Sequence, residues 1–421
     1  MNSGFYIIMA AQFFSSLADN ALLVAAIALL MQADSPTWLT PYLKFFFVIS
    51  YVVLAPWVGA FADRLPKGQV MFIANTVKIL GCVTMLWGAH PLLAYAIVGL
   101  GAAAYSPAKY GILTELLPAE QLVIANAWIE GLTVLSIILG NVVGGMLIGP
   151  KVSGVLLRFD MPFIDTSINT PPEAAIVVTA LIYVVAALFN LAIPDTGARY
   201  QHQERNPVRL LVDFSRCFLM LWRDKLGQIS LAVTTLFWGA GACLQFIVLK
   251  WAERSLRLPL EEGAMLSGVS AVGIALGAMI AAKIIPLKRA TAVLPVGIAM
   301  GIALITLVSV RWMPAVYVLL IVIGAIGGFF VVPMNALLQH RGHVLMSAGH
   351  SIAVQNFNEN VSILVMLALY ALMIRLDFRI QSVVLIFGLF ISGAMYFIMR
   401  WNAANHKADP HLDRLIGEAK H

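Results

Sequence analysis

The sequence predicts an all-α membrane protein with twelve transmembrane helices in two pseudo-symmetric six-helix bundles. Three observations predict this fold: the composition, the spacing of the apolar segments, and an echo between the two halves of the chain. Hydrophobic residues make up 61% of the 421 residues and charged residues 11%, whereas soluble domains average about 45–50% and about 25%. A soluble protein could not bury so much apolar surface, so the helices must be surrounded by lipid.

Apolar segments long enough to cross a bilayer, about 20 residues each, recur along the whole chain. They are expected at 5–31, 42–62, 69–89, 91–114, 122–148, 174–194, 227–251, 262–285, 290–310, 314–338, 346–374 and 380–400. The first is expected to remain as a membrane helix, because no Lys or Arg precedes it and polar residues interrupt it. The predicted organisation is an N-terminal bundle (1–194), a cytoplasmic linker (195–226), a C-terminal bundle (227–401) and a cytoplasmic tail (402–421).

The distribution of Lys and Arg predicts the orientation. With both termini in the cytoplasm, the segments inside carry sixteen of these residues and the segments outside carry nine, while Lys78 and Lys109 lie within spans. Cytoplasmic loops of membrane proteins carry an excess of Lys and Arg, so we expect both termini inside. The net charge of +6 is explained by this rule, and no nucleic-acid partner is expected.

The linker contains a predicted amphipathic helix. Its basic side carries Arg209 and Arg216, with Asp213 between them, and its apolar face carries Leu210, Leu211, Phe214, Cys217, Phe218 and Leu221. Such a helix is expected to lie at the cytoplasmic membrane surface with its basic side toward anionic headgroups; the alternative is a plain connecting helix. The three cysteines do not have the spacing of a metal or redox site, so we expect small core residues and no cofactor.

The two halves echo each other in their fourth and fifth spans. Gly99 and Gly101 precede Pro107 in span four, as Gly324 and Gly327 precede Pro333 in span ten. With the prolines aligned, Lys109 falls opposite Asn335. Polar pairs four residues apart follow in spans five and eleven, Asn126 with Glu130 and Gln355 with Glu359. Duplicated halves around a site near the bilayer midplane are typical of transporters.

The loop GAFADRLPKG at 59–68 resembles a signature of the major facilitator superfamily. Gly59 permits close helix packing, Asp63 and Arg64 lie at a helix end, and Lys67 belongs to a short basic turn. The resemblance implies a gating role, in which this loop latches the two halves on the cytoplasmic side; the alternative is an ordinary basic loop. The counterpart at 277–289 lacks the Asp, so the latch is expected to be one-sided.

Polar residues within the spans are the candidate substrate-binding residues, because an ionisable group at the bilayer centre costs at least about 2.5–3.5 kcal/mol unless it faces a cavity or a partner. They are Asp19, Asn20, Lys78, Lys109, Asn126, Glu130, Gln245, Gln355, Asn356 and Glu359. Most of the charges belong to the first half, whereas the second half offers mainly amides and aromatic rings. This asymmetry suits an amphipathic substrate, although an internal salt bridge explains Lys78 equally well.

Several longer motifs resemble the bacterial lysophospholipid transporters of the same superfamily. They are ADNALL (18–23), GAAAYSPAKYGILTEL (101–116), AN-x3-E (125–130), LFWGAG (236–241), GGFFVVPMNALLQ-x-RG (327–342) and AVQNFNEN (353–360). The resemblance implies a monomeric transporter in the bacterial inner membrane that flips lysophosphatidylethanolamine and lysophosphatidylglycerol inward by alternating access. A cytoplasmic acyltransferase/acyl carrier protein synthetase would then restore the second acyl chain.

One position departs from this resemblance. A member of the family can carry Arg after LFWGAG-x-x-Leu, where this chain has Gln245. If that Arg meets the lipid phosphate, Lys78 or Lys109 must replace it. Lys109 lies about 27 Å along its helix, and three roles stay open for it. It can extend to the inner interface, pair with Glu115 or Glu130, or receive the phosphate.

Two other functions are compatible with parts of the sequence. A proton-coupled exporter of drugs or other amphiphiles would have the same fold, with Asp19, Glu130 and Glu359 as proton carriers. A membrane enzyme is the second alternative, because GHSIA at 349–353 is close to the G-x-S-x-G motif. That motif requires a strand–turn–helix context, and here it would open a membrane helix, so we expect a transporter and not an enzyme.

Overall fold

The computed structural model describes residues 3–35, 40–158, 168–198, 200, 206–258, 260–410 and 412–416. Within these residues the secondary structure is entirely helical, and twelve helices are long and apolar enough to cross a membrane. The prediction of an all-α protein with twelve spans is therefore confirmed. Of the cations used to predict the orientation, Arg199, Arg205 and Lys420 lie outside the described residues.

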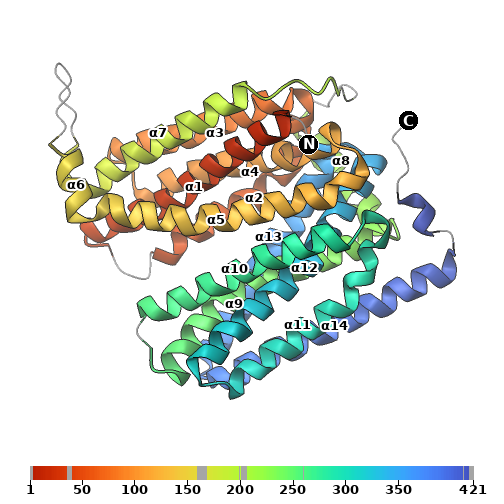
Figure 1. The fold of residues 1–421 in the computed structure, drawn as a ribbon. Helices are drawn as coiled ribbons and strands as arrows, with labels where there is room; N and C mark the ends of the chain where they lie inside the picture. The colour runs from red at the N-terminus through yellow and green to blue at the C-terminus, as the bar shows by residue number, and fades with distance from the viewer. Residues whose placement is uncertain are drawn as a thin grey trace. The chain divides into compact units, whose positions relative to one another are not determined.

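The chain divides into two compact units. Unit 1 comprises Met1–Leu116 and Leu135–Leu211, and unit 2 comprises Leu117–Val134 and Val212–His421. The helices of unit 1 are α1 (Ser3–Gln32), α2 (Thr40–Arg64), α3 (Lys67–Leu86), α4 (Pro91–Leu116), the second half of α5 (Leu122–Ile148), α6 (Pro150–Leu156) and α7 (Pro171–Leu191). Figure 1 shows α1, α7 and α3 side by side, and α4 packs against both α3 and α2.

Local sequence fixes where the helices of unit 1 begin and how closely they approach. At the start of α7, the Glu173 carboxylate accepts hydrogen bonds from the backbone of Thr170 and Asn169, which forms a capping box. Gly101 of α4 lies against α3, where an added Cβ atom would come within 2.6 Å of the Ala74 carbonyl oxygen. This close approach brings α3, and with it Lys78, against α4.

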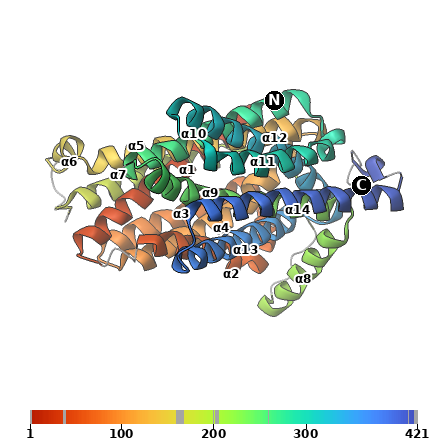
Figure 2. The same ribbon diagram turned by 90° about the horizontal axis from the view of Figure 1, so that it is seen from below.

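Unit 2 contains the first part of α5, most of α8, and six membrane-spanning helices. The helices after α5 are α8 (Pro207–Arg223), α9 (Gly227–Ser255), α10 (Leu260–Ile284), α11 (Leu294–Thr306), α12 (Met313–Leu345), α13 (Ala348–Arg375) and α14 (Ile380–Ala408). Short 3₁₀ helices lie at Ala119–Gln121, Leu287–Val293, Leu307–Ser309 and Leu412–Leu415. Figure 2 shows α14 beside α11, and α14 also packs against α9.

The observed helices differ from the predicted spans mainly at three places. The span expected at 290–310 begins as a 3₁₀ turn and becomes α-helical only at Leu294, because Pro295 lacks an N–H and suits a helix's first turn. Helices α12 and α14 continue several residues past the expected ends at 338 and 400. Helix α6 lies in the loop at 149–173, where no helix was predicted.

The linker helix α8 packs partly against α13. Leu210, Phe214 and Leu221 of its predicted apolar face are buried, and the rings of Phe214 and Phe218 contact Phe357 of α13. Part of this face therefore packs on protein, and the location of α8 at the cytoplasmic membrane surface stays a prediction. Leu211 of the predicted face is exposed, as are Val208, Val212 and Leu219 elsewhere on the helix.

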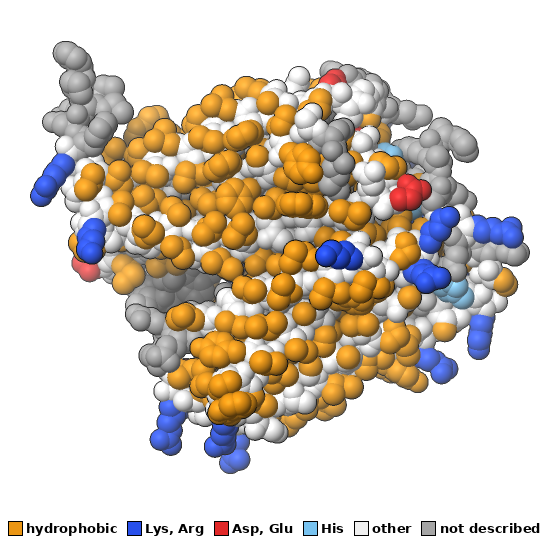
Figure 3. Space-filling model, viewed as in Figure 1, with side chains coloured by type: hydrophobic (Ala, Val, Ile, Leu, Met, Phe, Trp, Pro, Cys, Tyr) orange, Lys and Arg blue, Asp and Glu red, His pale blue; other side chains and the backbone are white. Residues whose placement is uncertain are grey.

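The outer surface agrees with a lipid environment. On the face drawn in Figure 3, apolar side chains cover the length of the helices, and most Lys and Arg side chains lie near helix ends. Exposed apolar residues occur in every span-length helix, such as Val53 of α2, Leu181 of α7 and Leu389 of α14. Because exposed apolar surface of this extent is unfavourable in water, the described surface fits a protein embedded in a bilayer.

Candidate functional site

A buried ion pair lies halfway along the helices of unit 1. The Lys78 Nζ atom is 2.8 Å from Asp19 Oδ1 and 2.9 Å from Oδ2. The Lys78 side chain is 1% exposed and the Asp19 side chain 21% exposed, so the pair can be approached only from the Asp19 side. The sequence left the partner of Lys78 open, and the structure assigns Asp19.

Polar and aromatic side chains from α1, α3, α4 and α7 form a transmembrane polar cluster around this pair. The Tyr183 hydroxyl donates to Asp19 Oδ1 at 2.6 Å. Lys78 donates to Ser15 Oγ at 3.0 Å, and Ser15 in turn donates to Asn75 Oδ1 at 2.8 Å. The Lys78 ammonium group also lies over the rings of Tyr105 and Tyr183, 5.1 and 5.4 Å from their centroids. A lysine so surrounded is stabilised both by charge pairing and by cation–π contacts.

The chemistry of this cluster is that of two opposite charges held in a low-dielectric interior. Such a pair is destabilising unless further hydrogen bonds satisfy both groups, and here Tyr183 and Ser15 supply them. Each charged group can exchange its partner for an opposite charge on a ligand. The cluster can therefore bind one anionic and one cationic group close together.

Asn20 and Lys109 are the other two residues of unit 1 that were predicted in the site. The Asn20 amide donates to the Ser16 carbonyl one turn earlier in α1 at 2.8 Å. Lys109 is half-buried in α4, with its Nζ atom 4.3 Å from the centroid of the adjacent Tyr110 ring. The structure thus places Asp19 and Lys78 together.

A second charged cluster surrounds the α2–α3 turn, where the gating residues were predicted. Lys67 Nζ is 2.6 Å from Asp63 Oδ1 and 3.5 Å from Glu115 Oε1 of α4, and all three side chains are nearly fully buried. The other Glu115 contacts come from the segment after α7: Thr196 Oγ1 and the Tyr200 hydroxyl each donate to it at 2.8 Å. The ammonium group of Lys67 also lies 5.0 Å from the centre of the Tyr200 ring.

This second cluster encloses a small cavity of about 100 Å³. Arg64 is exposed at its edge, and Gly59 is buried within α2. Lys67, expected in a basic turn, is instead a buried first residue of α3. The signature residues Asp63 and Lys67 therefore join α2 and α3 to the end of α4 and to the start of the linker.

Amide side chains dominate the buried polar groups of unit 2. Asn126 of α5 and Gln339 of α12 exchange two hydrogen bonds of 2.9 Å, and both side chains are at most 1% exposed. Gln355 of α13 donates to Asn335 of α12 at 3.1 Å and to Glu359 at 2.8 Å. The predicted pairing of Gln355 and Glu359 on one helix face is confirmed by this contact.

The remaining predicted residues of unit 2 occupy different environments. Glu130 is buried one turn after Asn126, and Asn356 is buried beside Gln355 in α13. Gln245 is exposed on α9. The structure thus brings Gln355 and Glu359 together and pairs Asn126 with Gln339, a residue that the sequence reasoning did not select.

An arginine at the end of α12 forms a charged cluster that the sequence analysis missed. Arg341 makes a two-point contact with Asp224, with Nη2–Oδ1 at 2.8 Å and Nε–Oδ2 at 3.2 Å. It also donates to the Leu415 carbonyl at 3.0 Å, and the Gly227 amide donates to Asp224 at 2.7 Å. Arg341 therefore joins the end of α12, the start of α9 and the segment after α14.

Some of the missed residues left a signal in the sequence and others did not. Asn75 lies three residues before Lys78, so helical spacing alone places both on one face. Asp224 and Tyr200 lie in the polar linker, where nothing in the spacing distinguishes them from ordinary surface residues. Tyr183 lies in an otherwise apolar span, and only the three-dimensional packing shows that its hydroxyl reaches Asp19.

The twelve spans and the buried charges halfway along them define a membrane transporter. Residues 8–367 match the family model of the Major Facilitator Superfamily. The chain is 42% identical over 379 residues to the lysophospholipid transporter LplT of Yersinia enterocolitica serotype O:8, which covers 89% of this chain and 88% of that relative. LplT of Yersinia pestis strain Pestoides F is 42% identical over 380 residues, with the same coverage. The chain belongs to the Major Facilitator Superfamily and, within it, to the family of these lysophospholipid transporters.

Solved structures support the same fold at low sequence identity. A bacterial homologue of the iron transporter ferroportin matches with a TM-score of 0.70 at 13% identity, covering 96% of this chain and all of that chain. The fucose:proton symporter FucP of E. coli matches at 0.69 and 13%, covering 94% and 98%. The human organic anion transporter MFSD10 matches at 0.67 and 14%, covering 99% and 100%. These likenesses confirm the predicted fold. The family match makes the chain a transporter and not an enzyme.

Proposed function

We propose that this protein carries lysophospholipids, lysophosphatidylethanolamine and lysophosphatidylglycerol, inward across the bacterial inner membrane by alternating access. The observation that supports this most is the 42% identity to lysophospholipid transporters over 89% of the chain. The interior chemistry agrees, because a lysophospholipid has one charged end and one hydrocarbon chain. Unit 1 offers a buried ion pair, and unit 2 offers amides and aromatic rings.

The Asp19–Lys78 pair is proposed to bind the headgroup by exchanging partners. The ammonium group of lysophosphatidylethanolamine would replace Lys78 at the Asp19 carboxylate, and the phosphate would replace Asp19 at Lys78. The headgroup then supplies both charges that the pair loses, so neither buried group is left unpaired. Asn20, Lys109, Gln245, Asn356 and Glu359 complete the proposed binding set, with Lys109 as a later contact for the phosphate.

Asn126, Glu130 and Gln355 are proposed as binding residues that act only after a rearrangement. The side chain of Asn126 is fully occupied by Gln339 and the backbone of Leu122, so it can meet a substrate only when that pair opens. Gly59, Asp63, Arg64 and Lys67 are proposed as the gate, because their cluster joins three helix ends through charges. A salt-bridge network can carry coupling between distant parts of a protein when it has two discrete arrangements.

The same proposal includes the domains, the orientation in the membrane, the oligomeric state and the partner enzyme. Residues 1–194 and 227–401 are the two bundles that alternate, joined by the linker 195–226, and the tail 402–421 is cytoplasmic, as are both termini. The protein works as a monomer. Its product, a lipid with one chain in the inner leaflet, must be consumed by an acyl-transferring enzyme. A cytoplasmic acyltransferase/acyl carrier protein synthetase is the proposed partner.

Uptake of radiolabelled lysophosphatidylethanolamine into cells that lack their own transporter tests the function. The wild-type chain should restore uptake, and Asp19→Asn should abolish it at equal expression. Lys250→Met is the matched control, because Lys250 is a half-buried lysine in a pair with Glu253 at the end of α9. No uptake from well-expressed wild-type protein would overturn the proposal. In proteoliposomes, transport of drugs but not of lysolipids, dependent on a pH gradient, would favour the exporter alternative.

A further inference from the structure

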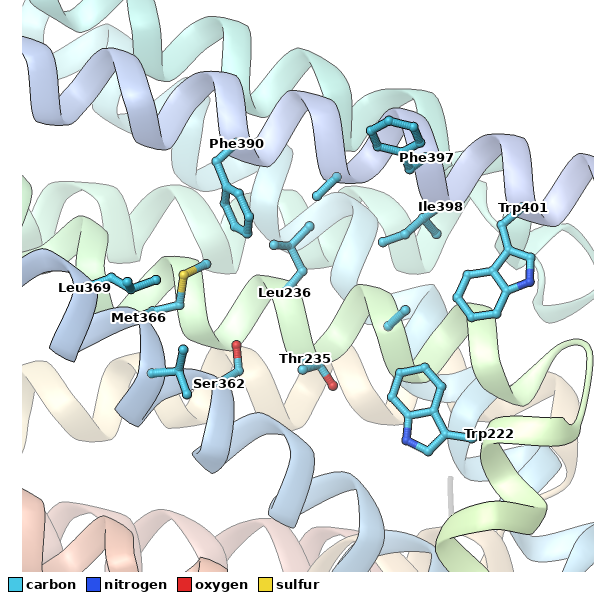
Figure 4. Close-up of a pocket in the computed structure, with 13 residues that line it drawn as sticks. Trp222, Thr235, Leu236, Ser362, Met366, Leu369, Phe390, Phe397, Ile398 and Trp401 are labelled. Carbon is cyan, nitrogen blue, oxygen red and sulfur yellow. The ribbon is translucent and has the colours of Figure 1, made fainter.

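Unit 2 has a long apolar groove that is separate from the polar clusters described above. It encloses about 640 Å³ between α9, α13 and α14, and Trp222 of α8 stands at one end. Figure 4 shows Leu236, Met366 and Phe390 pointing into it from the three helices. The lining residues of α14 extend from Phe390 to Trp401, which corresponds to about 16 Å along the helix axis.

The groove opens toward the surroundings of the helices, which are hydrocarbon in a bilayer. Its lining side chains Val365, Leu369, Phe390 and Phe397 are 52%, 49%, 49% and 72% exposed, and α9, α13 and α14 are all of spanning length and hydropathy. Water does not reach such a surface inside a membrane. A flexible hydrocarbon chain is therefore the occupant that matches both the shape and the polarity of the groove.

One end of the groove has the character of a membrane–water interface. Trp222 and Trp401 lie together at this end in Figure 4, and Trp222 Nε1 donates to Asn358 Oδ1 at 3.3 Å. Tryptophan is enriched at headgroup depth, where its ring contacts hydrocarbon and its N–H finds a polar partner. The two indoles thus mark the end of the groove at which a lipid headgroup would lie.

Positive charge surrounds the same end. Arg223 and Arg400 are exposed and directly adjoin the two tryptophans in the chain, and Lys225 follows. The acidic residues nearby are already engaged, because Asp224 contacts Arg341 and Asp409 lies 3.6 Å from Lys225. The net charge at this end is therefore positive, and it complements an anionic headgroup.

We propose that this groove binds one acyl chain of an anionic two-chain phospholipid of the surrounding bilayer, with the phosphate near Arg223, Lys225 and Arg400. The open side of the groove lets the second chain remain in the bilayer, so a two-chain lipid fits without deforming the helices. The proposal concerns a resident lipid on the outer wall of unit 2. It does not depend on which lipid the protein transports.

Quenching of tryptophan fluorescence by brominated lipids tests the site, because Trp222 and Trp401 line it. The full chain is placed in phosphatidylcholine nanodiscs that contain a small fraction of phosphatidylglycerol brominated on one acyl chain, or the same fraction of brominated phosphatidylcholine. Phosphatidylglycerol should quench more strongly than phosphatidylcholine. Unbrominated phosphatidylglycerol should reverse this excess, and unbrominated phosphatidylcholine should not.

Variants with matched controls test whether the excess quenching by brominated phosphatidylglycerol arises in the groove. Ala394→Phe fills the groove and should remove the excess quenching, whereas Leu389→Phe, an exposed position of α14 outside the groove, should keep it. Arg400→Gln should reduce the excess at least twofold, and Arg379→Gln at the other end of α14 should not.

Equal quenching by the two brominated lipids in the wild-type chain would overturn the proposal, as would excess quenching that survives Ala394→Phe. Quenching by brominated lysophosphatidylglycerol alone would also overturn it, because the occupant would then be a single-chain lipid. The competition arm needs only the wild-type chain, so the test holds even if a variant fails to fold.

Discussion

Near the middle of their helices, the two units bury polar groups by different chemistry. Unit 1 holds a full ion pair, Asp19 with Lys78, near the middle of its helices, whereas Asn126, Gln339, Asn335 and Gln355 of unit 2 hold one another by amide hydrogen bonds. A buried charge is far more costly to leave without its partner than a buried amide. In the middle of the helices, unit 1 is therefore the more sensitive to single substitutions, and its charges are the groups that a charged ligand can displace.

The C-terminal ends of α4 in unit 1 and α12 in unit 2 can also be compared. Each carries a charged residue with a buried side chain, and the two residues have opposite charges. Glu115 and Arg341 each lie eight residues after the proline inside their helix, Pro107 and Pro333. Glu115 accepts hydrogen bonds from Thr196 and Tyr200 in the segment after α7, and Arg341 donates to the Leu415 carbonyl in the segment after α14. Positions at the same distance from the two prolines thus hold the segments after α7 and α14 with opposite charges.

The largest effect is expected at the ion pair of unit 1. Lys78→Met leaves the Asp19 carboxylate with Tyr183 as its remaining partner and should lower the free energy of unfolding by about 3 kcal/mol. Thermal unfolding in detergent measures the loss, and uptake of lysophosphatidylethanolamine should also disappear. In the double variant Asp19→Asn/Lys78→Met, stability should recover while uptake stays absent. A double variant as unstable as the single one would show that the pair is not the cause.

A somewhat smaller effect is expected at the end of α12. Arg341→Gln breaks the contact with Asp224 and the bond to the Leu415 carbonyl, but Asp224 keeps the Gly227 amide. The loss should be about 2–3 kcal/mol, and the segment after α14 should become sensitive to limited proteolysis. Glu115→Gln in unit 1 is the comparison: it should cost less, because the amide oxygen can still accept from Thr196 or Tyr200 and Lys67 keeps Asp63 as its partner. Equal losses of unfolding free energy in Arg341→Gln and Glu115→Gln would contradict the contacts assigned to these two residues.

Among the buried groups, substitution of the Asn126–Gln339 pair of unit 2 should lower the free energy of unfolding least. Asn126→Ala leaves the buried Gln339 amide without its partner and should cost about 1–2 kcal/mol. Replacing both residues by Leu should recover most of the loss, because no buried polar group is then left unsatisfied. Thermal unfolding of the three variants forms the test, and an additive loss in the double variant would show that the two residues act independently.

The sequence predicted the spans well because hydrophobic length alone decides them, as in α4, expected at 91–114 and found at Pro91–Leu116. It also placed Gln355 and Glu359 on one face, since helical spacing fixes that contact. It could not pair Lys78 with Asp19, because 59 residues and no periodic pattern separate them. The contact of α8 with α13 could not be predicted for a related reason. An apolar face is the same pattern whether it covers lipid or protein, and only the contact with Phe357 distinguishes the two.

The smallest effect on stability is expected at Gln245. Substitution there tests whether the two units differ in binding the lipid phosphate. Gln245 is exposed on α9, so Gln245→Arg should change the free energy of unfolding by less than about 0.5 kcal/mol. If unit 2 lacks a cation that contacts the lipid phosphate, the added guanidinium should lower the KM for lysophosphatidylglycerol and leave thermal stability unchanged. Gln245→Met is the control of similar size without charge, and it should leave the KM as it is or raise it. An unchanged KM in Gln245→Arg would mean that the positive charges of unit 1 already satisfy the phosphate.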